Sequence, residues 1–330
     1  MKGIMKIREK ILIQRIFFLG LILVLSFTLS LSWAQKVVRL SIATGGTGGV
    51  YYPYGEGMAK VLSKYLNVEA TVEVTQGSVG NGKRMGAGKA DLAFMMSDVG
   101  FDAFHGKGRF MKKVPIRSLA VLYTNSMHIV TLEGMGMEKV TDLKGKRVST
   151  GAPESGTEVK ALRILRAYGL NPDKDLKRDR LSASESANAL RDKKIDAYFW
   201  DSGLPTASVV ELATTPGIRI KLIGHEDAIP KMIAKYGNFY FKTTIPKGTY
   251  FGLEEDVVVA GVGNLLICQE KMDETLAYDI IRTLFNHRPE LVESSKVAQS
   301  LRLESAVAGS PLPFHPGAIR YFEEKGIQVN

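Results

Sequence analysis

Six short segments rich in Gly, Ser and Thr carry the residues that could bind a ligand. Each follows a stretch with the pattern of a β-strand, and several lead directly into a helical pattern. In parallel sheets, ligands bind at the carboxyl ends of the strands, and a helix N-terminus offers free N–H groups to an anion. We therefore expect a site for a carboxylate or a phosphate. The segments are residues 44–52, 76–81, 97–100, 151–158, 182–186 and 201–205.

The predicted ligand contacts in these segments are hydroxyl groups, backbone N–H groups and two aromatic rings. None of the segments contains Lys or Arg, so we expect several N–H and O–H donors to hold a carboxylate, with no arginine clamp. Tyr51 and Tyr52 would supply an apolar wall with a phenolic hydroxyl. The alternative is that the polar side chains only cap their own helices. The residues predicted to contact the ligand are Thr47, Gly48, Gly49, Tyr51, Tyr52, Ser78, Ser97, Asp98, Ser155, Gly156, Thr157 and Asp201.

Two of these residues, Asp98 and Asp201, directly follow predicted strands. A buried ionised carboxylate needs a partner, because unpaired burial costs several kcal/mol. An ammonium group on the ligand would serve, so we expect an α-amino acid such as glutamate or glutamine to bind better than the matching keto acid. The alternative is that both aspartates cap helices or bridge two lobes.

Motifs for other chemistries are incomplete in this sequence. Gly46-Thr47-Gly48 lacks the third glycine of a dinucleotide fingerprint, because Tyr51 stands at that position. The five histidines form no H-x-x-x-H pair, and none lies near the single cysteine, Cys268. We therefore expect no catalytic residues, no cofactor and no metal. Cys268 lies in an apolar run and is expected to be a small buried hydrophobic residue.

The charge of the chain is mildly basic, with a formal net value of +10. Five basic residues and one acidic residue lie in the first 34 positions, which leaves +6 for the rest. Elsewhere basic and acidic residues are interleaved, as in residues 174–180, which we expect to form a solvated face. This distribution predicts no nucleic-acid partner.

The N-terminus has the pattern of a secretory signal. A basic stretch ends at Arg15, residues 16–31 are mostly apolar, and Ser32-Trp33-Ala34 resembles a cleavage site. The apolar stretch of about 16 residues is shorter than the roughly 20 needed to span a bilayer, which favours cleavage over a permanent anchor. We therefore interpret residues 1–34 as a signal peptide, cleaved near Ala34 to leave a soluble periplasmic protein.

A common pattern of strand, glycine-rich segment and helix occurs twice along the chain. Gly45 lies 46 residues before Asp91, and Gly151 lies 45 residues before Asp196. The spacing predicts an α/β fold of two lobes with parallel-rich sheets around a ligand cleft. Residues 117–132 and 257–267 are the candidate crossings between lobes. The expected boundaries are residues 35–125 and 259–330 for the first lobe and 126–258 for the second.

The chain resembles the solute receptors of the TAXI class of TRAP transporters. The resemblance implies a periplasmic-binding-protein type II fold, and delivery of the ligand to separate membrane permease subunits for ion-coupled uptake. It also implies glutamate, glutamine or related dicarboxylates as ligands. The motifs that carry it are residues 43–55, 77–81, 90–94, 97–99, 142–148, 155–158, 196–199 and 203–205.

Other functions fit a signal-bearing binding protein less well. A sensor or adhesin-type ligand-binding protein is the first alternative, and a periplasmic ligand-modifying enzyme is the second. The predicted assembly state is a monomer.

Overall fold

The computed structural model describes residues 37–329 together with Met5 and Lys10. The predicted cleavage site at Ala34 and nearly all of the predicted signal peptide lie outside the described residues. The chain divides into two units, residues 1–38 and residues 39–330, and the fold is that of the second unit. In the described part of the chain, no helix combines the length and apolar character that a membrane crossing requires.

One mixed sheet organises the fold. Its strand order is β2-β1-β3-β10-β4-β7-β5-β6, with β8 paired to β4 and β9 paired to β10. The strands are β1 (Val38–Ala43), β2 (Val68–Glu73), β3 (Leu92–Met96), β4 (Ile116–Leu132), β5 (Arg147–Ser149), β6 (Lys177–Asp179), β7 (Ala197–Ser202), β8 (Ile220–Leu222), β9 (Tyr240–Ile245) and β10 (Val257–Gln269).

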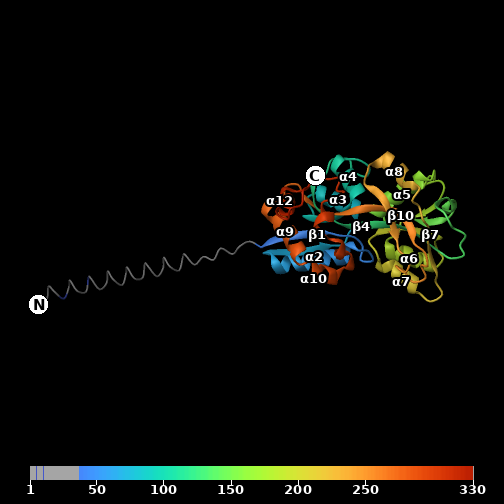
Figure 1. Ribbon diagram of the computed structural model, residues 1–330, viewed down its shortest axis with the longest axis horizontal. Helices are drawn as coiled ribbons and strands as arrows, with labels where there is room; N and C mark the ends of the chain where they lie inside the picture. The colour runs from blue at the N-terminus through green and yellow to red at the C-terminus, as the bar shows by residue number, and fades with distance from the viewer. Residues whose placement is uncertain (1–4, 6–9, 11–36, 330) are drawn as a thin grey trace. The chain divides into compact units, whose positions relative to one another are not determined.

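Helices cover the sheet at both of its ends. In Figure 1, α2, α9, α10 and α12 gather around β1, while α5, α6, α7 and α8 gather around β7. The α-helices are α2 (Tyr51–Tyr65), α3 (Ser78–Gly86), α4 (Ser97–His105), α5 (Gly156–Ala167), α6 (Ala183–Arg191), α7 (Ala207–Thr214), α8 (Ala228–Tyr236), α9 (Glu274–Asn286), α10 (Arg288–Ser294), α11 (Leu303–Ala306) and α12 (Pro316–Glu324), and the 3₁₀ turns are η1 (Val140–Leu143) and η2 (Lys296–Ser300).

The two-lobed α/β class predicted from the sequence is confirmed. In the first lobe β1 pairs parallel to β3, and in the second β5 pairs parallel to both β6 and β7. The helices form where the sequence supplies a cap and an apolar stripe. In α6, for example, Ser182 and Glu185 form a capping box, each side chain accepting the other residue's backbone N–H.

Two long strands, β4 and β10, pass between the lobes. β4 is one continuous strand of 17 residues and contains the candidate crossing at residues 117–132. Its first part pairs antiparallel with β10, and its second part pairs with β7 and β8. The predicted boundaries at 125/126 and 258/259 fall within β4 and β10, and these lobe limits stay a prediction.

Buried apolar side chains form three clusters, one of which joins the first helix to the C-terminal part of the chain. In this cluster Tyr54 and Leu62 of α2 pack with Leu284 of α9 and Phe322 of α12. The C-terminal helices therefore return to the first lobe. Cys268 belongs to the same cluster and is fully buried, and burial raises the pKa of its thiol to about 12. Its predicted role as a small buried hydrophobic residue is confirmed.

Candidate functional site

A small cavity lies where the Gly-, Ser- and Thr-rich segments of the two lobes meet. Its volume is about 50 Å³. Four of the six predicted segments line it, while residues 97–100 and 182–186 do not. The lining consists of Gly45, Gly46, Gly49, Val50, Tyr51, Gln76, Gly77, Ser78 and Met96 from the first lobe, and Ser155, Gly156, Thr157, Trp200, Asp201 and Ser202 from the second.

The structure brings seven of the predicted contact residues together around this cavity. They are Gly49, Tyr51, Ser78, Ser155, Gly156, Thr157 and Asp201. That these residues contact a ligand stays a prediction.

The other five predicted residues lie outside the lining, for different physical reasons. Thr47 is exposed, and Gly48 faces Ser184, whose Oγ lies 2.3 Å from the place a Cβ would occupy. Tyr52 lies beside Glu56, whose hydrogen bond raises the pKa of the phenol. Ser97 and Asp98 are buried in the first turn of α4.

Two glycines of the lining sit where the lobes touch. A Cβ on Gly156 would stand 2.2 Å from Met96 Sδ and 2.9 Å from Ser78 Oγ, both of the opposite lobe. A Cβ on Gly49 would stand 3.0 Å from the indole of Trp200. Any side chain at Gly156 would therefore hold the lobes apart.

The N-terminus of α5 faces the cavity. Ser155 is its N-cap: the Ser155 hydroxyl accepts from Glu158 N–H at 3.0 Å and donates to the Ala152 carbonyl at 2.7 Å. The alternative stated above, that a polar side chain of these segments caps its own helix, therefore holds for Ser155. Within the described residues, the N–H groups of Gly156 and Thr157 donate to no protein acceptor, and both residues line the cavity. Thr157 Oγ1 accepts from Asp201 N–H at 3.2 Å.

The N-termini of α2 and α3 differ in what they can offer. α2 begins at Tyr51 without a side-chain cap, and Val50 and Tyr51 line the cavity. At α3, the Val79 and Gly80 N–H groups donate to the Glu154 carbonyl of the other lobe, at 3.1 and 3.0 Å. The expectation that residues 76–81 present free N–H groups to a ligand is therefore wrong for these two donors.

Asp201 sits at the end of β7 with its side chain fully buried. Its Oδ1 pairs with Lys160 Nζ at 3.1 Å, and Lys160 also donates to the Ala260 carbonyl of β10 at 2.8 Å. Burial raises the Asp201 pKa to about 6, and Lys160 partly offsets that rise. Within the described chain, Asp201 Oδ2 has no hydrogen-bond partner.

The other aspartate, Asp98, bridges the lobes instead of facing the cavity. Its carboxylate pairs with Arg163 of α5 at 3.3 Å and accepts from the Tyr240 hydroxyl at 2.8 Å. Arg163 also pairs with Asp102 at 2.5 Å and stacks over the Tyr236 ring. Asp98 therefore has its partners within the protein, and the prediction that it requires a ligand ammonium is wrong.

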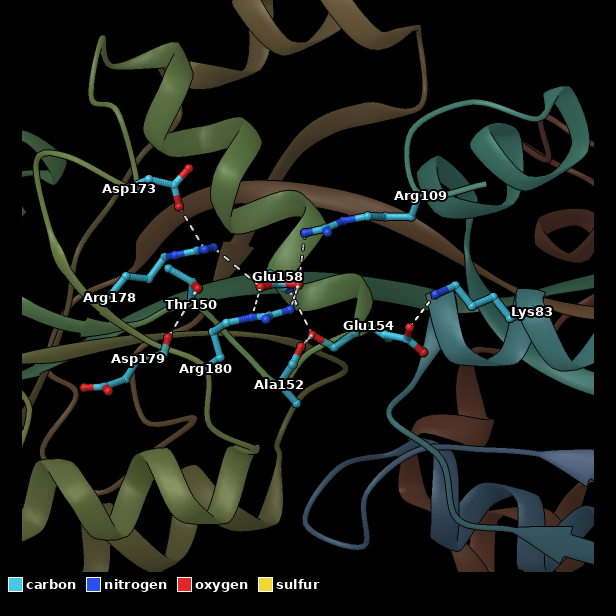
Figure 2. A network of polar contacts seen from close by, with 11 residues as sticks. Lys83, Arg109, Thr150, Ala152, Glu154, Glu158, Asp173, Arg178, Asp179 and Arg180 are labelled. Carbon is cyan, nitrogen blue, oxygen red and sulfur yellow. Dashed lines mark hydrogen bonds and ion pairs between the residues drawn. The ribbon is translucent and has the colours of Figure 1, made fainter. Parts of the chain in front are cut away.

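A second ion-pair network crosses the rim of the cleft beside the cavity (Figure 2). Glu158 of α5 is almost completely buried and contacts the guanidinium groups of Arg109, Arg178 and Arg180. Only Arg109 comes from the first lobe. The charged residues of 174–180 are exposed or half-exposed, as predicted, and two of the arginines, Arg178 and Arg180, also reach the buried Glu158.

Some residues of the site were not predicted from the sequence, because they lie at strand ends or inside a helix. Met96 and Trp200 are the residues immediately before two predicted segments, so extending each segment by one residue would have included them. Lys160 and Arg163 lie inside a helix, where a basic residue normally indicates a solvent-facing position. No local signal distinguishes them.

Comparisons with known proteins give a family and a fold. The sequence model of the NMT1-like family matches residues 42–326. A solved structure from Bordetella bronchiseptica RB50 is 16% identical, with a TM-score of 0.50 over 87% of this chain and 89% of that chain. The alkanesulfonate-binding protein SsuA from Xanthomonas axonopodis pv. citri, bound to MOPS, is 14% identical, with a TM-score of 0.48 over 88% and 92% of the two chains.

A curated protein matches part of the chain at low identity. It is the 3-methyl-2-oxobutanoate hydroxymethyltransferase of Chlorobium luteolum (strain DSM 273 / BCRC 81028 / 2530), which is 23% identical over 158 residues. The match covers 48% of this chain and 54% of that protein, so the chain spans about half the length of this relative.

Proposed function

The chain belongs to the NMT1-like family, and we propose that it is a periplasmic solute-binding protein that captures a small carboxylate. In this proposal the N-terminal signal directs export, and the mature protein delivers its ligand to the membrane subunits of a TRAP transporter for ion-coupled uptake. Glutamate, glutamine or a related dicarboxylate is the proposed ligand class. The resemblance of the loop motifs to TAXI receptors supports the transporter type.

The observation that carries the proposal is the meeting of two helix N-termini at one cavity. The first turns of α2 and α5 come from different lobes, and both contribute residues to the lining. Free N–H groups and the positive end of the helix dipole favour an anion, more strongly where water is excluded. Among the described lining residues there is no Lys or Arg, so these dipoles and the hydroxyls are the candidate anion ligands.

The size of the cavity supports a small ligand. A space of about 50 Å³ corresponds to roughly three to five water-sized positions. A nucleotide or a peptide would need a wider opening.

For delivery, the membrane partner must distinguish the ligand-bound protein from the ligand-free protein. Contacts between the lobes would make the ligand-bound form different in shape. Glu154, Arg163 and Arg109 each join one lobe to the other beside the cavity. Because β4 and β10 are the two described strands that cross between the lobes, hinge closure around the ligand is the expected motion. A membrane partner could then recognise the closed form.

Titration calorimetry on protein freed of ligand by unfolding and refolding tests the proposal. L-glutamate, L-glutamine and succinate are the probes, and L-arginine and methanesulfonate are the comparison ligands. We expect at least one carboxylate probe to bind at a single site, and the Gly156→Val variant to abolish that binding by holding the lobes apart. Binding only of methanesulfonate would refute the carboxylate assignment, whereas binding only of L-arginine, which itself carries a carboxylate, would refute the proposed glutamate, glutamine or dicarboxylate class.

Uptake into vesicles that contain candidate TRAP membrane subunits tests the delivery step. Uptake of the ligand that depends on this protein and on an ion gradient is the expected result. Ligand binding without any stimulation of uptake would favour a sensor or adhesin role.

A further inference from the structure

We propose that the cavity continues at Asp201 into a subsite for a protonated amine, built from three buried oxygen atoms. They are Tyr123 OH, Asp201 Oδ2 and Asn264 Oδ1, which we name the hinge-floor cluster. This inference rests on the proposed function and deepens it: a ligand whose carboxylate meets α2 and α5 would place an ammonium group in the cluster.

Each atom of the hinge-floor cluster is buried without a hydrogen-bond partner among the described residues. Asn264 is 0% exposed, Tyr123 is 4% exposed and Asp201 is 6% exposed. Buried polar atoms in folded proteins are almost always hydrogen-bonded, since an unsatisfied one costs about 1–3 kcal/mol. Three such atoms in neighbouring residues point to a bound group that completes their hydrogen bonds.

The three residues lie where β4 and β10 cross between the lobes. Asn264 of β10 is the register partner of Tyr123 of β4, so the two side chains share one face of the sheet. A Cβ on Gly203, two residues after Asp201, would stand 3.0 Å from the Tyr123 ring.

The cluster is continuous with the cavity through Tyr51 and Asp201, which both line it. Burial raises the pKa of the Tyr51 phenol, and its hydrogen bond with Ser78 lowers it. Burial also raises the pKa of the Tyr123 phenol, and the neighbouring Tyr51, Tyr54 and Asp201 add to the rise. Tyr123 is thus a neighbour of both Tyr51 and Asp201.

The chemistry of the three atoms calls for a donor. Asn264 Nδ2 donates to Asn125 Oδ1 at 3.0 Å, which leaves Asn264 Oδ1 as an acceptor. Asp201 Oδ1 already binds Lys160, so Oδ2 remains to accept. Two obligate acceptors and one hydroxyl match the three N–H donors of an ammonium group.

The test compares L-glutamate with glutarate, which has the same two carboxylates and no amine. In the wild type we expect L-glutamate to bind at least about tenfold tighter than glutarate. Tyr123→Phe and Asn264→Leu should each weaken L-glutamate binding about three- to tenfold and leave glutarate binding unchanged. Tyr198→Phe is the matched control, because its phenol is also buried without a partner but belongs to a separate apolar cluster; it should change neither affinity.

Three results would overturn the inference in distinguishable ways. Equal binding of glutarate and L-glutamate by the wild type removes the amine subsite and leaves the carboxylate function standing. Equal losses for both ligands in Tyr123→Phe and Asn264→Leu assign the cluster a structural role. If neither probe binds, the ligand that the purified protein retains decides between the two hypotheses. A retained ligand without an amine overturns the subsite. A retained ligand that has an amine but no carboxylate supports the subsite and refutes the carboxylate function.

Discussion

The Glu154 carbonyl accepts a hydrogen bond from Val79 N–H at 3.1 Å, so a residue of the second lobe caps a helix of the first. Gly80 N–H donates to the same oxygen at 3.0 Å, and the Glu154 side chain contacts Lys83. Glu154 holds a left-handed backbone with φ of 64°, a conformation that a non-glycine residue adopts at some cost. These contacts can exist only while the lobes are closed.

The Glu154→Pro variant tests this connection. Proline fixes φ near −65°, which would move the carbonyl away from α3. We expect ligand affinity to fall at least about tenfold, while the ligand-free protein keeps its melting temperature, because the bonds form only on closure. Lys83→Ala is the control: its ion pair is about half exposed on both sides, so the expected loss is under threefold. Wild-type affinity in the proline variant would show that these bonds do not contribute to closure.

Thr157→Val should weaken binding at least about tenfold, a loss of roughly 1.4 kcal/mol. The variant keeps the shape of the side chain but loses the hydroxyl at the cavity, which also accepts from Asp201 N–H. Thr47→Val provides the matched control, because Thr47 is exposed and outside the lining. Unchanged calorimetric affinity in Thr157→Val would remove Thr157 from the site.

Arg163→Met should lower the free energy of unfolding of the closed, ligand-bound protein by about 3–5 kcal/mol, because it leaves buried carboxylates without their partner. Both Asp98 and Asp102 depend on this guanidinium, whose side chain is 8% exposed. Arg39→Ala removes an ion pair that is mostly exposed, and it should lower the free energy of unfolding by less than about 1 kcal/mol. Urea unfolding of the two variants compares them, and similar losses would contradict the importance of burial.

His128 should make the protein less stable as the pH falls from about 6.5 to 4. Burial lowers its pKa to about 4, so the folded state keeps the imidazole neutral while the unfolded chain takes up a proton. His128 would lose about 3 kcal/mol of stabilisation over that range. His225, whose pKa burial lowers to about 3, adds to this slope.

Asp201 opposes that trend. Its folded pKa of about 6 lies above that of an unfolded aspartate, so its contribution to stability falls as the pH rises from about 4 to 6. Urea unfolding at pH 7 and pH 5 should show a smaller pH dependence for His128→Gln than for the wild type. Parallel pH profiles for the two proteins would mean that His128 titrates alike in the folded and unfolded states.

The repeated strand-and-helix pattern could be predicted because local signals specify it. Apolar periodicity located α2 and α9, and Ser182 with Glu185 marked the start of α6. The cavity was partly predictable for the same reason: strand ends in a parallel sheet share one edge, so Ser78, Thr157 and Asp201 were expected to meet there.

The partners of the buried charges could not be predicted. Asp98 and Arg163 are 65 residues apart, and no local pattern indicates that they meet. The same holds for Asp201 and Lys160, 41 residues apart. The left-handed backbone of Glu154 could not be predicted either, because glycine or asparagine is the residue that usually adopts this conformation. Tertiary contacts fix each of these features.

Native mass spectrometry of the gently purified protein, followed by identification of the released ligand, tests the central claim most directly. We predict one small carboxylic acid per chain, which disappears after unfolding and refolding and fails to co-purify with Gly156→Val. A protein that retains no ligand and binds no carboxylate, or one that retains only a ligand without a carboxylate group, would contradict this account.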